Sequence, residues 1–114
     1  MYHRFEENKY PSTNIRISDF LKHLEIIQNQ NIQFINPKNF AKELLKNKKK
    51  RKVLLTIDDG FSSFYENAWP ILKERKIPFI LFINTREVGS FNYMNWNEIK
   101  EISKESFVEI GNHS

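Results

Sequence analysis

The stretch VLLTI at residues 53–57 constrains the fold of this chain more than any other feature, because it is an unbroken apolar run that stops abruptly at Asp58-Asp59-Gly60. It lacks the polar–apolar alternation of a half-exposed strand, which is typical of a strand buried on both faces of a parallel sheet. A second such run covers residues 77–83, and a third strand is predicted over residues 107–110. Strands separated by helix-length segments indicate right-handed βα units, so the predicted fold class is α/β.

Four helices are predicted between the strands. Ser18 is expected to cap the first helix, and Pro37 to open the second. The third helix must begin or kink at Pro70. Asn95 and Glu98 have the spacing of a capping box at the start of the fourth. Two shorter strands are predicted over residues 2–5 and 32–35.

The size and composition of the chain limit its chemistry. A length of 114 residues suits one domain, and no apolar run approaches the ~20 residues of a membrane span. Met1 is followed directly by Tyr2, so no signal peptide is visible. Because there is no cysteine, any transition metal would be held by His, Asp, Glu and water.

Positive charge is concentrated in one short segment. The net charge is +4, but residues 46–52 contribute six positive charges, so the rest of the chain sums to −2. A chain that is acidic outside one run is not expected to bind nucleic acids, although such a run can attract phosphates or anionic lipid. The simpler interpretation is a solvated connection that keeps the following strand from aggregating.

Candidate functional residues follow two of the predicted strands. Asp58 and Asp59 end the most buried strand, and His113 follows the strand at residues 107–110. The carboxyl ends of parallel strands share one edge of a sheet, so these side chains are expected to face one crevice. Adjacent desolvated carboxylates need a cation. One carboxylate and a histidine could bind a divalent metal, while the other carboxylate takes a proton from water.

Simpler interpretations of these residues exist. Asp-Asp-Gly is also a common turn, and His113 could belong to a frayed terminus. His23 is expected to be solvated, whereas His3 could make a core hydrogen bond or lie at the rim of the crevice. The two tryptophans are expected to be packing residues rather than sugar platforms; they are Trp69 and Trp96.

Several segments resemble the NodB-like polysaccharide deacetylases. Thr56-Ile57-Asp58-Asp59-Gly60 is similar to their first motif, Thr-Phe-Asp-Asp-Gly, and Gly111-Asn112-His113-Ser114 to the approach to the second, His-Ser/Thr-x-x-His. The resemblance implies a distorted (β/α) barrel that hydrolyses N-acetyl or O-acetyl groups on an acetylated polysaccharide. It implies that Asp58 is the general base, and that Asp59 and His113 are ligands of zinc or a similar divalent ion.

The chain also departs from the family pattern. Ile57 replaces the usual Phe, and the second histidine of the second motif would fall at position 117, after Ser114. We therefore expect residues 1–114 to be the N-terminal portion of a deacetylase domain, an open partial barrel with an incomplete metal site. Such a fragment is expected to be inactive alone and poorly soluble or loosely packed, because its apolar edge strands are unpaired.

Two other classes of protein share parts of this pattern. A receiver-type signalling domain also pairs acidic residues at a strand end, but it needs an aspartate after a later strand, and none follows Asp59. A non-catalytic polysaccharide-binding remnant, which keeps the crevice without the chemistry, stays open as the alternative.

Overall fold

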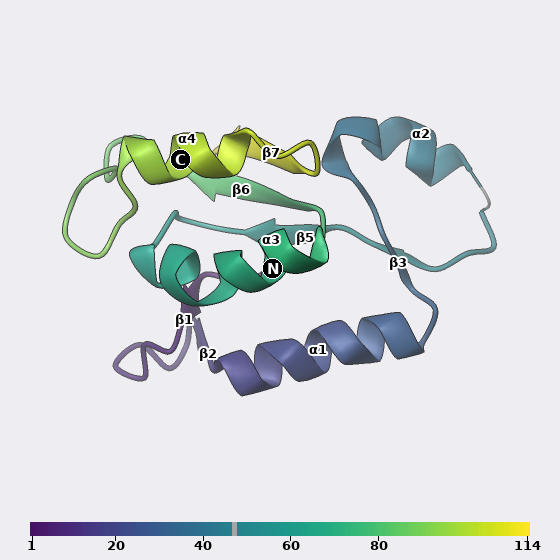
Figure 1. The fold of residues 1–114 in the computed structure, drawn as a ribbon, viewed down its shortest axis with the longest axis horizontal. Coiled ribbons are helices and arrows are strands. Elements are labelled where there is room, and N and C mark those ends of the chain that lie inside the picture. The colour runs from purple at the N-terminus through teal and green to yellow at the C-terminus, as the bar shows by residue number, and fades with distance from the viewer. Residues whose placement is uncertain (47) are drawn as a thin grey trace.

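A computed structural model describes residues 1–46 and 48–114, and a three-stranded parallel sheet lies at its centre (Figure 1). The strands run in the order β5 (Leu55–Ile57), β6 (Phe79–Ile83) and β7 (Val108–Asn112). Both neighbouring pairs are parallel, as the apolar runs predicted. The α/β class is therefore confirmed.

The two N-terminal strands form a small sheet of their own beside β5. Strand β1 (Arg4–Phe5) pairs in parallel with β2 (Asn14–Ile15). Just before β1, the Tyr2 N–H donates to the Thr56 carbonyl at 2.9 Å, and the Asp58 N–H donates to the Tyr2 carbonyl at 2.8 Å. These two bonds place the start of the chain beside the end of β5.

A further short pair precedes β5. Strand β3 (Gln33–Phe34) pairs in parallel with β4 (Lys52–Val53), and only Leu54 separates β4 from β5. The predicted strand at residues 53–57 therefore changes partners along its length, from β3 at its beginning to Tyr2 and β6 at its end. Within the described residues the strands form three small parallel sheets and no closed barrel, in agreement with the expected partial barrel.

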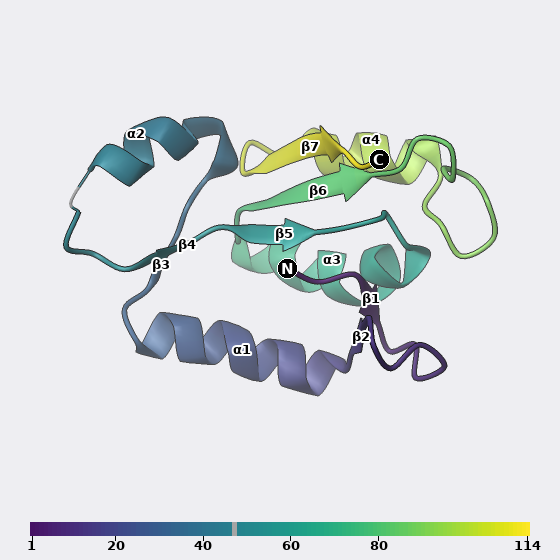
Figure 2. The ribbon, with the colours of Figure 1, turned by 180° about the vertical axis from the view of Figure 1, so that it is seen from behind.

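Four α-helices connect the strands: α1 (Ile17–Asn29), α2 (Phe40–Leu45), α3 (Trp69–Arg75) and α4 (Trp96–Ser103). A 3-10 turn at Pro37–Asn39 precedes α2, and a π-helical turn at Phe64–Ala68 precedes α3. Figures 1 and 2 show α3 and α4 on the same face of the central sheet, with the strands in front when the molecule is seen from behind. Helices on one face only are the arrangement of a barrel wall rather than of a doubly wound sheet.

The helix ends follow the sequence in part. The capping box of α4 is confirmed, because Asn95 Oδ1 accepts the Glu98 N–H at 3.0 Å and Glu98 Oε2 accepts the Asn95 N–H at 2.8 Å. Pro70 lies in the first turn of α3 and so begins that helix. The cap at Ser18 was wrong: α1 starts at Ile17 after an extended Arg16, which makes no side-chain cap.

Aromatic side chains dominate the core under the central sheet. The Phe5 and Phe20 rings meet edge to face at 5.1 Å, and the Phe79 ring lies 5.6 Å from Phe64 and 6.0 Å from Trp69. Trp69 is thus a packing residue as expected, whereas Trp96 is exposed and the expectation was wrong for it. The largest fully buried side chains are Phe5, Phe20, Phe64, Phe79, Leu24, Ile57, Leu72, Leu81, Met94, Ile102 and Val108.

Candidate functional site

The chain turns sharply at the carboxyl end of β5. Asp59 has a φ of 73° and Gly60 a φ of 78°, both in the left-handed region. Asp tolerates this conformation better than most residues, and Gly adopts it without strain. The turn leaves Asp58 buried and Asp59 partly exposed. Non-glycine residues held in this region are often found at functional sites.

The structure brings the predicted residues together at the carboxyl edge of the sheet. His113 Nε2 lies 3.7 Å from Asp59 Oδ1 and 3.8 Å from Asp58 Oδ2. The backbone of His113 is not frayed, because its N–H donates to the Ile83 carbonyl at 2.8 Å and so continues the pairing of β7 with β6. Main-chain pairing across the sheet therefore fixes where His113 lies.

A second histidine joins this cluster from the other side. His3 Nε2 lies 4.0 Å from Asp58 Oδ2, so the partly buried His3 side chain lies beside Asp58 and not in the core. The backbone bonds of Tyr2 to the end of β5 hold His3 at this edge. Sequence reasoning left His3 undecided because only this pairing between the chain start and residue 57 reveals its neighbour.

Asp58 has a buried carboxylate oxygen, Oδ1, that no other described group contacts by a hydrogen bond. A desolvated carboxylate oxygen left unpaired costs free energy, and a cation nearby compensates for that cost. The two imidazoles beside the carboxyl group are the nearest groups that can become positively charged.

The donors present suit a divalent metal in kind. A carboxylate oxygen of Asp59 and a ring nitrogen of His113, 3.7 Å apart, can both reach one ion at about 2.0–2.2 Å. Within residues 1–46 and 48–114, no group of three or more His, Cys, Asp and Glu side chains is arranged to hold a metal. The pair would therefore supply two ligands, and the other positions of an ion would have to be filled by water or further groups.

The Arg4 side chain, which forms an ion pair with Glu7, lies between two aromatic rings next to the turn at Asp59-Gly60. The Arg4 guanidinium lies 3.5 Å from the centre of the Phe61 ring and 4.1 Å from that of Tyr10. Arg4 also donates to Glu7 at 3.1 Å, and Glu7 accepts the hydroxyl of Ser63 at 2.6 Å. This network ties β1, which follows His3, to the loop that follows Gly60.

Two tyrosines near the site stay protonated at neutral pH. Burial raises the pKa of the Tyr93 phenol, with additional contributions from the carboxylates of Glu87 and Asp59. Burial also raises the pKa of Tyr2, whose hydroxyl lies 2.7 Å from Nδ1 of His23. His23 is exposed, as expected for a solvated side chain, and it has this hydrogen-bond partner in addition.

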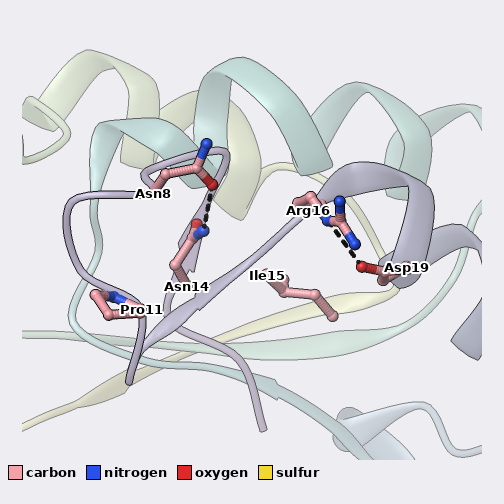
Figure 3. Close-up of a pocket in the computed structure, with 6 residues that line it drawn as sticks. All are labelled: Asn8, Pro11, Asn14, Ile15, Arg16 and Asp19. Atoms are coloured by element: carbon pink, nitrogen blue, oxygen red, sulfur yellow. Dashed lines mark hydrogen bonds and ion pairs between the residues drawn. The ribbon is translucent and has the colours of Figure 1, made fainter.

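Two pockets lie near the cluster, and one of them includes a member of it. A pocket of about 390 Å³ is lined by Asn8, Pro11, Asn14, Ile15, Arg16 and Asp19, none of which belongs to the cluster (Figure 3). A neighbouring pocket of about 320 Å³ includes His3 together with Asn14 and Ile15 of β2. The second pocket therefore gives His3 a solvent-accessible side.

Gly111 provides a test of how tightly β7 positions His113. A Cβ added at Gly111 would lie 2.5 Å from the ring of Phe82, its partner on β6. We expect Gly111→Ala to lower the free energy of unfolding by about 1–3 kcal/mol, as overpacking does. Chemical denaturation measures this change, with Ser106→Ala, an exposed position before β7, as the control. An unchanged midpoint would mean that the Phe82 ring moves aside freely.

Comparison with known proteins assigns this architecture to a family. The family model described as polysaccharide deacetylase matches residues 45–114, which is more than half of the chain. The poly-beta-1,6-N-acetyl-D-glucosamine N-deacetylase of Staphylococcus aureus is 35% identical over 103 residues, covering 85% of this chain and 36% of that protein. The chain therefore belongs to the polysaccharide deacetylase family.

Solved structures agree with this assignment. IcaB from Ammonifex degensii superposes with a TM-score of 0.81 at 32% identity, covering 98% of this chain and 50% of that one. A de-N-acetylase from Aggregatibacter actinomycetemcomitans has the same fold, with a TM-score of 0.84 at 18% identity over 98% of this chain and 52% of that one. The chain spans about a third of the length of its curated relatives and about half of these structures.

Proposed function

We propose that the protein acts in metal-dependent hydrolysis of acetyl groups on a polysaccharide, with N-acetyl groups as the main target. The single observation that carries this proposal is the cluster of Asp58, Asp59 and His113 at the carboxyl edge of the sheet. A paired carboxylate and imidazole beside a second, buried carboxylate is the donor set of metal-assisted hydrolysis. In this proposal residues 1–114 form the N-terminal portion of the deacetylase domain.

The three residues take distinct roles in the proposal. Asp59 and His113 hold the ion, which we propose to be zinc. When bound, zinc supplies Lewis acidity at the acetyl carbonyl. Asp58 is the general base: its buried carboxylate, flanked by two imidazoles, accepts a proton from the attacking water.

His3 is a candidate for the general acid of the proposed site. Its Nε2 is 4.0 Å from Asp58 Oδ2, and its side chain also lines the 320 Å³ pocket. An imidazole in contact with both the base and an open cavity can donate a proton to the departing amine or alcohol.

The names of the relatives support a proposal for the substrate class. The relative from S. aureus is named for de-N-acetylation of poly-beta-1,6-N-acetyl-D-glucosamine. We propose an acetylated polysaccharide of this kind as the substrate, with N-acetyl groups preferred over O-acetyl groups. Acetate release from oligomers of each type measures this preference directly.

The decisive experiment assays both the chain and a chimaera. In the chimaera, this chain replaces the matching segment of the S. aureus enzyme, so that its residues act in a full-length context. We expect acetate release by the chimaera and little by the chain alone, because Asp59 and His113 supply only two ligands. A chimaera that binds the oligomer and releases no acetate would instead support the polysaccharide-binding alternative.

Metal binding gives a prediction that does not depend on turnover. We expect Asp59→Ala and His113→Ala each to weaken zinc binding by about 100-fold or more, since even outer-shell changes cost about 10–100-fold. Isothermal titration calorimetry of the chimaera measures this loss. Asp19→Ala is the matched control, because that carboxylate lies on α1 and is paired with Arg16 and Lys22. Equal affinities in all three variants would remove Asp59 and His113 from the metal site.

A further inference from the structure

Helix α2 leaves its large apolar side chains exposed to solvent. Phe40 and Leu44 are four residues apart and share one row on the helix, and Ala41 and Leu45 form the adjacent row. All four are exposed, with exposed fractions of 42% for Phe40, 48% for Leu44 and 74% for Leu45. A surface helix normally turns its apolar stripe toward the core.

Glu43 is the one residue of α2 that is turned toward the protein. Glu43 is half-buried, and its Oε2 accepts a hydrogen bond from the Gln33 side chain on β3 at 3.4 Å. The ammonium group of Lys52 on β4 contacts the main-chain carbonyls of Glu43 and Lys46 at the end of the helix. These contacts fix the rotation of α2 about its axis and keep the apolar stripe outward.

This outward stripe is a concentrated feature of the surface. Seven large hydrophobic side chains are exposed in the described part of the chain, and three of them lie on this six-residue helix. Isolated exposed hydrophobics are ordinary, but a contiguous patch indicates an interaction surface.

Cationic side chains border the stripe on the C-terminal side. Lys42 is exposed on the helix, Lys46 is exposed directly after it, and Lys48, Lys49 and Lys50 are exposed further along. Asn47, within the same basic run, lies outside the described residues. Because the chain outside residues 46–52 carries a net charge of −2, the excess of positive charge comes from this segment.

We propose that α2 and the lysines at positions 46 and 48–50 form a docking surface for an anionic lipid bilayer. Apolar side chains that enter the headgroup boundary, flanked by lysines that meet anionic headgroups, are the features of interfacial helices. A nucleic acid would use the lysines but leave Leu44 and Leu45 without a role. No helix in the described residues is long and apolar enough to span a membrane, so the contact is peripheral.

The position of α2 relative to the candidate site determines how the docked protein would be oriented on the bilayer. Figure 1 shows α2 at one end of the long axis, beyond the beginning of β6, whose arrow points away from it. The Asp58 cluster lies at the carboxyl edge of that sheet. Docking through α2 would therefore leave the cluster facing the aqueous side, where a polymer can reach it. The docking proposal itself does not depend on the proposed activity.

Vesicle flotation tests the proposal with the chain itself. We expect binding to vesicles of phosphatidylcholine with phosphatidylglycerol, and little binding to phosphatidylcholine alone. Removing three lysines in Lys48→Gln/Lys49→Gln/Lys50→Gln should weaken binding by about 100-fold, at about fivefold for each lysine. Leu44→Ser/Leu45→Ser should also abolish flotation. All five side chains are exposed, so folding should be unaffected.

Matched controls use exposed residues of the same types elsewhere. Phe91→Ser and Lys100→Gln/Lys104→Gln change exposed positions away from α2 and should leave flotation unchanged. Equal binding to both vesicle types would overturn the proposal. A second result would also overturn it: the Leu44→Ser/Leu45→Ser variant floats like the parent chain and binds single-stranded RNA as tightly as the parent does. That result would mean that the lysines form a general site for polyanions.

Discussion

The Asp58→Asn substitution is expected to reduce acetate release by a factor of about 10²–10⁴, the usual contribution of a general base. Asparagine keeps the shape of the side chain but cannot accept the proton of the attacking water. Since Asp59 and His113 are unchanged, zinc affinity should stay close to that of the parent. Steady-state kinetics and zinc titration on the same chimaera measure the two quantities side by side.

The same substitution should move stability in the opposite direction. Asp58 Oδ1 is buried without a hydrogen-bond partner among the described residues, so the carboxylate is held at a cost in the metal-free protein. A neutral amide of the same size lowers that cost, and we expect the free energy of unfolding to stay equal or rise by about 1 kcal/mol. Activity sites often trade stability for function in this way.

Two comparisons separate this interpretation from a general loss of structure. Asp59→Asn should lose zinc affinity together with activity, whereas Asp58→Asn should lose activity alone. Full activity in Asp58→Asn would make the assignment of the base wrong. A fall in both stability and zinc affinity would instead assign Asp58 a structural or ligand role.

The central strands and the carboxylate–histidine cluster were predictable because both depend on local sequence. Residues 53–57 and 77–83 are apolar runs too short and too β-branched for helices, and they lie at β5 and β6. The expectation that Asp58, Asp59 and His113 meet needed only the rule that parallel strands end at one edge. The distances among them agree with that expectation.

The remaining features depend on contacts between distant parts of the chain. His3 lies near Asp58 because Tyr2 pairs with Ile57, and no sequence periodicity predicts that pairing. Similarly, spacing predicts that α2 has an apolar stripe, but not that Glu43 turns toward β3 and leaves the stripe outside. Sequence patterns define the faces of an element, while tertiary contacts decide which face is buried.

The Phe79→Ala substitution is expected to destabilise the protein by about 3–5 kcal/mol, the usual cost of removing a buried aromatic ring. Phe79 is fully buried, with 0% exposure, and lies on the middle strand of the central sheet between Leu55 and Val108. Its ring packs against Phe64 and Trp69, so the cavity opens where β6 meets the helical layer. Natural domains have only about 5–15 kcal/mol of stability, so the variant should be close to unfolding.

Phe91→Ala is the matched control, because that ring is 90% exposed and its loss should change stability by no more than about 0.5 kcal/mol. Urea denaturation followed by circular dichroism compares both variants with the parent. A large difference between the two variants requires a core with fixed packing. If Phe79→Ala costs no more than Phe91→Ala, and the parent unfolds with a shallow slope, the sheet holds together without specific packing, as the open edges of the sheet led us to expect from the sequence. The size of this one difference therefore decides whether the three strands that align Asp58, Asp59 and His113 form a rigid support or a loose one.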